Sequence, residues 1–95
     1  MLHEIKCQTI SSFDGTPIEV QSYGQGELTM VIANGIGGTM AVWAPMLKAF
    51  KHRIRFISWD YRGLYNSGSP PSLDALRVED HAQDLQCIMA ALQLK

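Results

Sequence analysis

The residues of this 95-residue sequence that are best suited to chemistry form a short glycine-rich segment, Asn34-Gly35-Ile36-Gly37-Gly38. Glycines let the backbone turn sharply and bring peptide N–H groups close to a ligand. A helix that begins just after such a turn favours negative charge at its N-terminus. The segment could therefore hold a cofactor pyrophosphate or the oxyanion that develops during acyl transfer, or it could be a plain tight turn.

The cofactor interpretation needs a ribose-binding acid and a third glycine. Asp60 follows Gly35 near the spacing of about 20 residues that such an acid requires. The third glycine of the dinucleotide pattern falls on Met40, whose side chain would keep the helix away from the strand. A nicotinamide-dinucleotide-binding domain is therefore the weaker alternative, and we expect no cofactor.

Two extended segments precede the glycines. Residues 4–10 and 17–23 alternate apolar and polar side chains, and Asp14-Gly15 between them is typical of a hairpin turn. We expect this hairpin at the antiparallel edge of a sheet. Residues 28–33 form a short, continuous apolar run, which predicts a strand buried on both faces.

The segment after the glycines predicts a strand-helix-strand unit. Apolar residues at helical spacing indicate a helix over residues 41–51, with Pro45 in its first turn. Residues 53–59 form another β-rich run, and the short connections favour a right-handed parallel crossover. A loop rich in Gly, Ser and Pro over residues 63–72 leads to a second helix. The apolar face of that helix is expected at Val78, Ala82, Leu85, Met89 and Leu92.

The composition describes a globular chain without a strong charge bias. Hydrophobic residues make up 46% and charged residues 18%, and the formal net charge is −1. This balance offers no basic surface to nucleic acid or to an anionic membrane, and no apolar run reaches the roughly 20 residues of a membrane span. We expect a cytoplasmic location, no bound metal, and buried free thiols at Cys7 and Cys87.

Three motifs carry a family resemblance: residues 31–38 (VIANGIGG), Trp43 with Pro45, and residues 59–68 (WDYRGLYNSG). Together they resemble the N-terminal part of an α/β-hydrolase-fold protein of the esterase, epoxide hydrolase and dehalogenase type. The resemblance implies an α/β fold class, with a β-hairpin followed by strand, helix, strand and helix. It extends over nearly the whole chain, so residues 1–95 are expected to form a partial α/β-hydrolase domain.

In that family, the turn after the third strand supplies an oxyanion donor. The resemblance implies that the backbone N–H of Ile36 takes this role, with Asn34, Gly35, Gly37 and Gly38 contacting the substrate. Asn34 stands where the family usually has His. It keeps a side-chain donor and an acceptor, but it has no ring that can ionise.

The resemblance also assigns structural support to Asp60, Arg62, Gly63 and Asp84. Asp60 and Arg62 are expected to form a structural pair that braces a loop, and not to act as catalysts. Tyr65 stands where the family often has Gly, so the backbone of this loop need not follow the family path.

The rest of the family's catalytic machinery is missing from these residues. The sequence contains no Gly-x-Ser-x-Gly nucleophile elbow, and none of His3, His52 or His81 lies where the family's general base lies. The resemblance thus implies a segment that ends before the elbow, in a hydrolase that cleaves an ester or related bond of a small-molecule substrate once the domain is complete.

The alternative is a non-catalytic fragment, or a half that associates with a separate C-terminal half. In the isolated chain, the family's strand order would leave the strand over residues 28–33 at an open sheet edge. Open edges pair with other chains, so we expect self-association through this strand.

Overall fold

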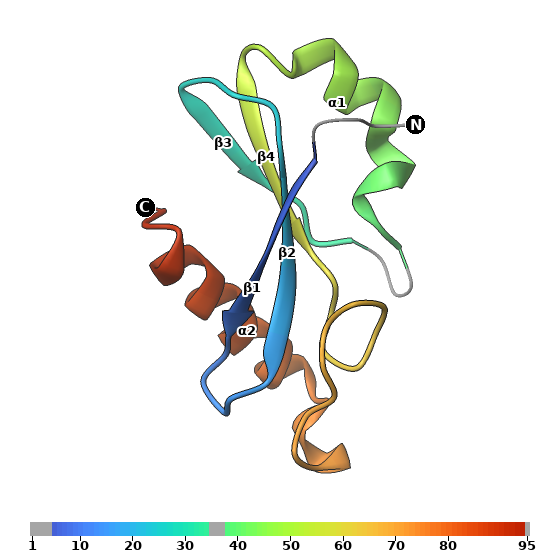
Figure 1. Cartoon of the computed structure of the whole chain (residues 1–95), viewed down its shortest axis with the longest axis vertical. Coiled ribbons are helices and arrows are strands. Elements are labelled where there is room, and N and C mark those ends of the chain that lie inside the picture. The colour runs from blue at the N-terminus through green and yellow to red at the C-terminus, as the bar shows by residue number, and fades with distance from the viewer. Residues whose placement is uncertain (1–4, 35–37, 95) are drawn as a thin grey trace. The chain divides into compact units, whose positions relative to one another are not determined.

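The computed structural model describes residues 5–34 and 38–94 (Figure 1). Over these residues the chain forms, in order, β1 (Lys6–Ser11), β2 (Pro17–Tyr23), β3 (Leu28–Val31), the 3-10 helix η1 (Met40–Trp43), α1 (Ala44–Phe50), β4 (Ile54–Trp59), the 3-10 helix η2 (Leu73–Ala75) and α2 (Val78–Ala91). Two hairpin strands followed by strand, helix, strand and helix confirm the α/β fold class predicted from the sequence.

The described strands form one mixed sheet in the order β1-β2-β4-β3. β3 and β4 run parallel, with Leu28 opposite Ile54 and Val31 opposite Ile57, while β2 pairs with β4 in the antiparallel sense. The hairpin therefore lies at the antiparallel edge of the sheet, as its sequence predicted. The segment between β3 and β4 is the expected parallel crossover.

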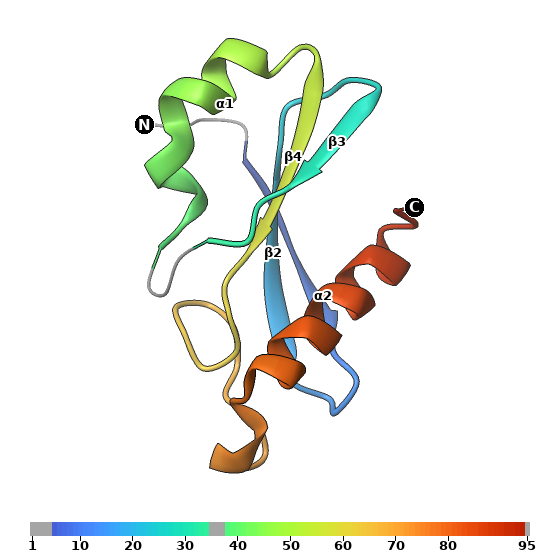
Figure 2. The same cartoon turned by 180° about the vertical axis from the view of Figure 1, so that it is seen from behind.

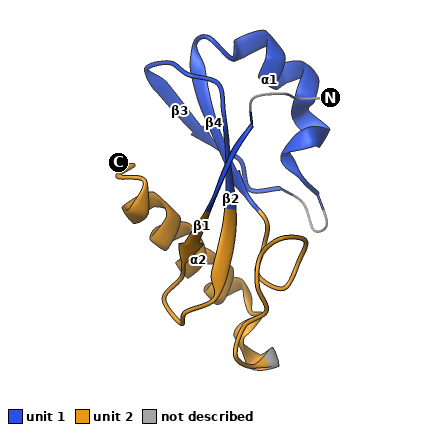
Figure 3. Ribbon diagram, in the orientation of Figure 1, with its two compact units in different colours: residues 1–8, 20–59 blue, residues 9–19, 60–95 orange. Residues whose placement is uncertain are grey.

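The chain divides into two compact units (Figure 3). The first unit contains residues 1–8 and 20–59, and it includes β3, η1, α1 and β4. The second contains residues 9–19 and 60–95, and it includes η2 and α2. β1 and β2 contribute residues to both units.

The first unit has an apolar core built from β2, β4, η1, α1 and the residue that follows β3. Its buried members are Tyr23, Ile32, Met40, Leu47 and Phe56. The backbone N–H of Ile32 also donates to the carbonyl of Ile57 at 2.8 Å, one position beyond the end of β3. Through this core, η1 and α1 pack against β2 and β4.

The crossover helix begins as a 3-10 turn, where the sequence predicted a single helix. Pro45 lies in the first turn of α1, as expected, and it has no N–H to donate to the carbonyl of Ala41. That carbonyl instead accepts from the N–H of Ala44, three residues later. The 3-10 geometry of η1 therefore follows from the proline.

β3 is more exposed than its sequence predicted. Figures 1 and 2 show it at the edge of the sheet, and β4 is its only neighbour among the described strands. The side chains of Leu28 and Met30 are exposed, at 66% and 42%. The prediction of burial on both faces is therefore wrong for this chain, because a continuous apolar run indicates that a strand can be covered and not that a covering element is present.

α2 buries a different face from the one its apolar residues predicted. Its buried residues are Asp80, Asp84 and Ile88, whereas Val78 is 80% exposed. Buried carboxylates are rare unless they are paired, and both aspartates here have arginine partners. The apolar pattern missed this face because ion pairing, rather than hydrophobicity, allows these residues to be buried.

The cysteines are less buried than the sequence predicted. Cys7 is exposed and Cys87 is half-buried, so the prediction of buried thiols is wrong for Cys7. Among residues 5–34 and 38–94, every helix is too short or too polar to cross a membrane.

Candidate functional site

The glycine segment is described at its two ends only. Asn34, which follows β3, is buried at 7% exposure, and Gly38, which precedes η1, is half-buried. Gly35, Ile36 and Gly37 lie outside the described residues. The oxyanion donor expected at Ile36 and the substrate contacts expected around it therefore stay predictions.

The Asn34 side chain joins three elements of the first unit. Its Nδ2 donates to Oγ of Ser58 in β4 at 2.6 Å, and its Oδ1 accepts from Nε1 of Trp43 in η1 at 3.1 Å. An indole N–H can only donate, so the amide oxygen must face Trp43 and the amide nitrogen must face Ser58. Both polar ends of the amide therefore have partners within the protein.

These bonds fix the point from which the glycine segment departs. Because β3 and β4 are parallel, their carboxyl ends meet at the same edge of the sheet, where α/β proteins place their ligands. Asn34 connects these two strand ends through the buried Ser58. The Asn34 amide uses both its donor and its acceptor. These are the same two functions that a histidine, which the resemblance leads one to expect at this position, would offer.

Sequence reasoning found Asn34 and Trp43 but missed Ser58. A signal for it exists, since Ser58 is a lone small polar residue inside the apolar run of β4, between Ile57 and Trp59. A buried polar side chain of that kind needs a hydrogen-bond partner. The pattern alone does not say which residue supplies that partner.

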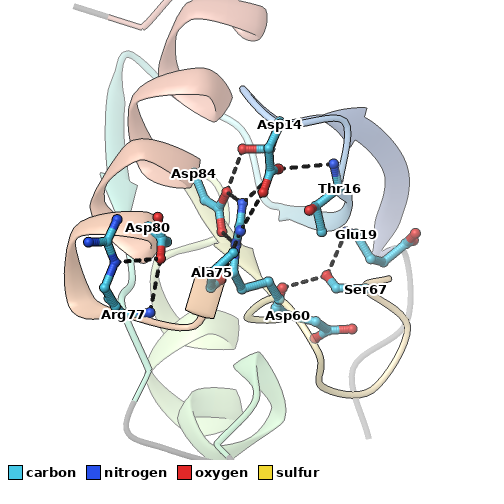
Figure 4. Close-up of polar contacts among 11 residues, drawn as sticks. Asp14, Thr16, Glu19, Asp60, Ser67, Ala75, Arg77, Asp80 and Asp84 are labelled. Atoms are coloured by element: carbon cyan, nitrogen blue, oxygen red, sulfur yellow. Dashed lines mark hydrogen bonds and ion pairs between the residues drawn. The ribbon is translucent and has the colours of Figure 1, made fainter. Parts of the chain in front are cut away.

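A second polar cluster lies in the second unit, around Arg62. Figure 4 labels three of the residues that Arg62 contacts, Asp14, Ala75 and Asp84. Arg62 is 1% exposed, and its guanidinium contacts two carboxylates, each through two bonds. Nε and Nη2 donate to Asp84 at 2.8 and 2.6 Å, and Nη1 and Nη2 donate to Asp14 at 2.9 and 3.1 Å. Nη1 also donates to the Ala75 carbonyl at 2.9 Å, and Ser12 Oγ donates to Asp84.

The cluster is held in its charged form. Hydrogen bonding from Arg62 holds the pKa of Asp14 well below its ordinary value, and hydrogen bonding to Asp84 raises the pKa of Arg62. Paired guanidinium–carboxylate bonds are the strongest ion-pair geometry that side chains offer. The arrangement ties the hairpin turn, the loop after β4 and α2 together within this unit, and it leaves the arginine with no donor directed at solvent.

The expected pair between Asp60 and Arg62 is not formed. Asp60 Oδ2 accepts from the backbone N–H of Asn66 at 3.2 Å, and the Asp60 carbonyl accepts from Ser67 Oγ at 2.5 Å. Arg62 turns instead to the carboxylates of Asp14 and Asp84, which match its forked donors. Asp60 and Arg62 therefore support the same loop through different partners.

The loop after β4 closes on itself with two residues in left-handed conformation. Gly63 has φ +79° and donates its N–H to the Gly68 carbonyl at 2.9 Å. Tyr65 has φ +48°, a conformation that normally favours glycine, and it occupies the position where the related pattern often has Gly. This backbone therefore keeps the glycine-like conformation without the glycine.

Ser67 and His81, two further reactive side chains among the described residues, have structural contacts. Ser67 Oγ is occupied twice, since it donates to the Asp60 carbonyl and accepts from the Glu19 N–H at 2.9 Å. His81 packs its ring against Tyr61, with ring centroids 5.2 Å apart. Within the described ranges there is no set of three or more His, Cys, Asp or Glu residues that could hold a metal ion.

Known proteins resemble this chain in sequence over most of its length. A family model described as the alpha/beta hydrolase fold matches residues 29–95. The chain is 33% identical to RutD of Caulobacter segnis, a proposed carbamate hydrolase, over 87 residues that make up 90% of this chain and 33% of that protein. The chain spans about a quarter to a third of the length of the curated relatives it matches.

Solved structures show the same fold. An esterase from Exiguobacterium antarcticum superimposes with a TM-score of 0.82 at 23% identity, covering 95% of this chain and 33% of the esterase. An epoxide hydrolase from Vigna radiata gives a TM-score of 0.81 at 19% identity, covering 99% of this chain and 29% of that enzyme. With its mixed sheet, its parallel crossover and its sequence match, the chain belongs to the alpha/beta hydrolase fold family.

Proposed function

We propose that this chain is the N-terminal part of a hydrolase that cleaves an ester or a related carbonyl bond, and that the N–H of Ile36 is one donor of its oxyanion hole. The observation that carries the proposal is the anchoring of Asn34 to Ser58 and Trp43. An oxyanion donor works only when it is held in place before the reaction begins. The anchored asparagine gives the next two peptide units a fixed starting point.

The substrate class follows from the chemistry of the transition state. Esters and carbamates both carry a carbonyl carbon, and attack by a nucleophile converts the carbonyl oxygen into an oxyanion. A backbone donor at the turn would stabilise that charge in either substrate. The kinship with a proposed carbamate hydrolase and the structural likeness to an esterase support this class of bond.

In this proposal Asp60, Arg62, Gly63 and Asp84 have structural roles. The Arg62 cluster holds the loop after β4 and the start of α2, while Asp60 and Gly63 close the loop itself. None of these residues supplies a nucleophile or a general base. They act by fixing the backbone of their unit.

A chimera tests whether the chain can serve a hydrolase. The aligned segment of Caulobacter segnis RutD would be replaced by this chain, and the product assayed against p-nitrophenyl acetate and a phenyl carbamate, with intact RutD as the reference. We expect saturable turnover with at least one of the two substrates. The isolated 95-residue chain should show none, because it has no nucleophile elbow.

The assay needs a measure of folding to be decisive. Circular dichroism and a cooperative thermal transition would establish that the chimera is folded. A folded chimera without turnover, beside an active RutD, would contradict the proposal and favour a non-catalytic segment.

A further inference from the structure

A small pocket lies in the first unit, at the end of β2. It has a volume of about 170 Å³ and is lined by Lys6, Tyr23, Gly24, Gln25, Lys51 and His52. Every lining side chain can donate a hydrogen bond, apart from the glycine, and none of them is acidic. We propose that this pocket binds a small oxyanion, of which inorganic phosphate is the simplest representative.

Tyr23 supplies a free hydroxyl donor to the lining of the pocket. Its side chain lines the pocket and belongs to the apolar core, with only 5% of the residue exposed. No hydrogen bond among the described residues engages its hydroxyl group. The hydroxyl is not among the buried atoms of the described residues that lack a partner, so it is accessible and can donate to an anion oxygen in the pocket.

The basic side chains of the pocket come from segments that are distant in sequence. Lys6 comes from β1, while Lys51 and His52 come from the turn between α1 and β4. The net charge of the chain is −1, so two lysines in one small pocket do not reflect a generally basic surface. The exclusion of nucleic acid from composition concerns an extended surface, and it does not apply to a single pocket of this size.

Two carbonyls at the end of α1, close in sequence to the pocket residue His52, already have hydrogen-bond partners. Helix C-termini carry partial negative charge on their free carbonyls, which would repel a bound oxyanion. The Lys51 carbonyl instead accepts from the Gln25 N–H at 2.7 Å, and the Phe50 carbonyl accepts from the Arg53 N–H at 2.9 Å. These two carbonyls at the end of α1 are therefore not free acceptors.

Gly24 explains how these groups come so close. It has φ +84°, and a Cβ atom at this position would lie 2.6 Å from the Ile54 carbonyl oxygen and 3.0 Å from that of Lys51. Only glycine allows the end of β2 to press against the turn after α1. That approach places the Gln25 amide and the Lys51 ammonium on the same pocket.

Phosphate titration of the 95-residue chain tests the site. Amide and side-chain signals would be followed by two-dimensional NMR as inorganic phosphate is added at constant ionic strength, with chloride as the matched anion. We expect saturable shifts at Tyr23, Gln25 and His52 with phosphate only. Shifts of equal size with chloride, or no saturation, would overturn the proposal.

Charge-matched variants distinguish a specific phosphate site from general electrostatic attraction of the anion. Lys51→Gln and Lys48→Gln remove the same charge from neighbouring surface positions, but only Lys51 lines the pocket. Lys51→Gln should weaken phosphate binding about fivefold or more, and Lys48→Gln should leave it within about twofold. Tyr23→Phe removes one donor and should also weaken binding. Equal weakening by both lysine variants, with thermal transitions unchanged, would contradict a specific pocket.

Discussion

Arg62 and Asp84 form a fully buried, two-point ion pair, with Nε 2.8 Å from Oδ2 and Nη2 2.6 Å from Oδ1. Asp84 lies in α2 and Arg62 in the loop after β4, so the pair joins two segments of the second unit. A buried pair of this kind is weak support for net stability, but each partner is indispensable to the other. Removing one leaves a charge in a place that water does not reach.

Replacement of Arg62 should therefore be costly. We expect Arg62→Met to lower the free energy of unfolding by about 3–5 kcal/mol, because Asp84 and Asp14 both lose their partner. Arg77→Met is the comparison, since Arg77 is largely exposed and Asp80 keeps the hydrogen bond from the backbone N–H of residue 77, so the loss should be smaller. Urea unfolding of both variants makes the comparison, and equal losses would contradict the special role of Arg62.

Acid should weaken the fold through Asp14. Its pKa is lowered in the folded chain by hydrogen bonding from Arg62, so the unfolded chain takes up this proton at a higher pH. The contribution of Asp14 to the free energy of unfolding is complete above its pKa in the unfolded chain, which is near 4. It is lost as the pH falls toward the lower pKa of the folded chain. Stability should therefore decline below about pH 4 and stay flat above it with respect to this group.

Asp14→Asn isolates that contribution. Asp80 shifts stability in the same direction, because its pKa is lowered by the backbone N–H and side chain of Arg77. The informative quantity is therefore the difference between the original chain and Asp14→Asn. That difference should be constant from pH 7 to about pH 5 and shrink below about pH 4. A difference independent of pH across this range would show that Asp14 does not titrate as described.

The anchor at Asn34 predicts a graded response to substitution. Asn34→Leu would leave the buried Ser58 hydroxyl without its partner and should cost about 1–3 kcal/mol. Asn34→His keeps one donor and one acceptor on a side chain that can bridge the same pair, so it should cost less. Thermal unfolding orders the variants, and equal costs for Leu and His would mean that the amide bonds contribute little.

The exposed strand β3 predicts self-association of the 95-residue chain. Leu28 and Met30 are exposed on a strand whose outer edge has no partner among the described strands. Lysine on an edge strand discourages pairing, so Met30→Lys should shift the chain toward monomer in sedimentation velocity. Val42→Lys adds the same charge at an exposed position outside the sheet and should not. A monomer at all concentrations before substitution would refute the open-edge account.

Local patterns predicted most of the fold. The alternation over residues 17–23, the β-rich run over 53–59 and Pro45 in a first helical turn each depend on neighbouring residues, and the structure confirms all three. The family motifs implied the same order of elements as these patterns, and the structure confirms it. Burial was harder to predict, because the exposure of β3 depends on which elements cover it and not on its own sequence.

The polar clusters could not be predicted in the same way. Arg62 gathers Asp14 from the hairpin turn and Asp84 from α2, and no spacing rule connects these three positions. Asp14 was recognised only as a turn residue, since Asp-Gly suits a hairpin whatever else its carboxylate does. The same limitation hid the partnership of Asn34 with Ser58, two residues that the parallel register of β3 and β4 brings together.

The oxyanion role of the turn can be tested most directly by removing one N–H. In the RutD chimera, Ile36→Pro deletes the proposed donor, whereas Ile36→Val changes the side chain and keeps it. We expect Ile36→Val to retain nearly full kcat and Ile36→Pro to lose about 10²–10³-fold, the range for one oxyanion donor. A folded Ile36→Pro chimera with undiminished kcat would contradict the account.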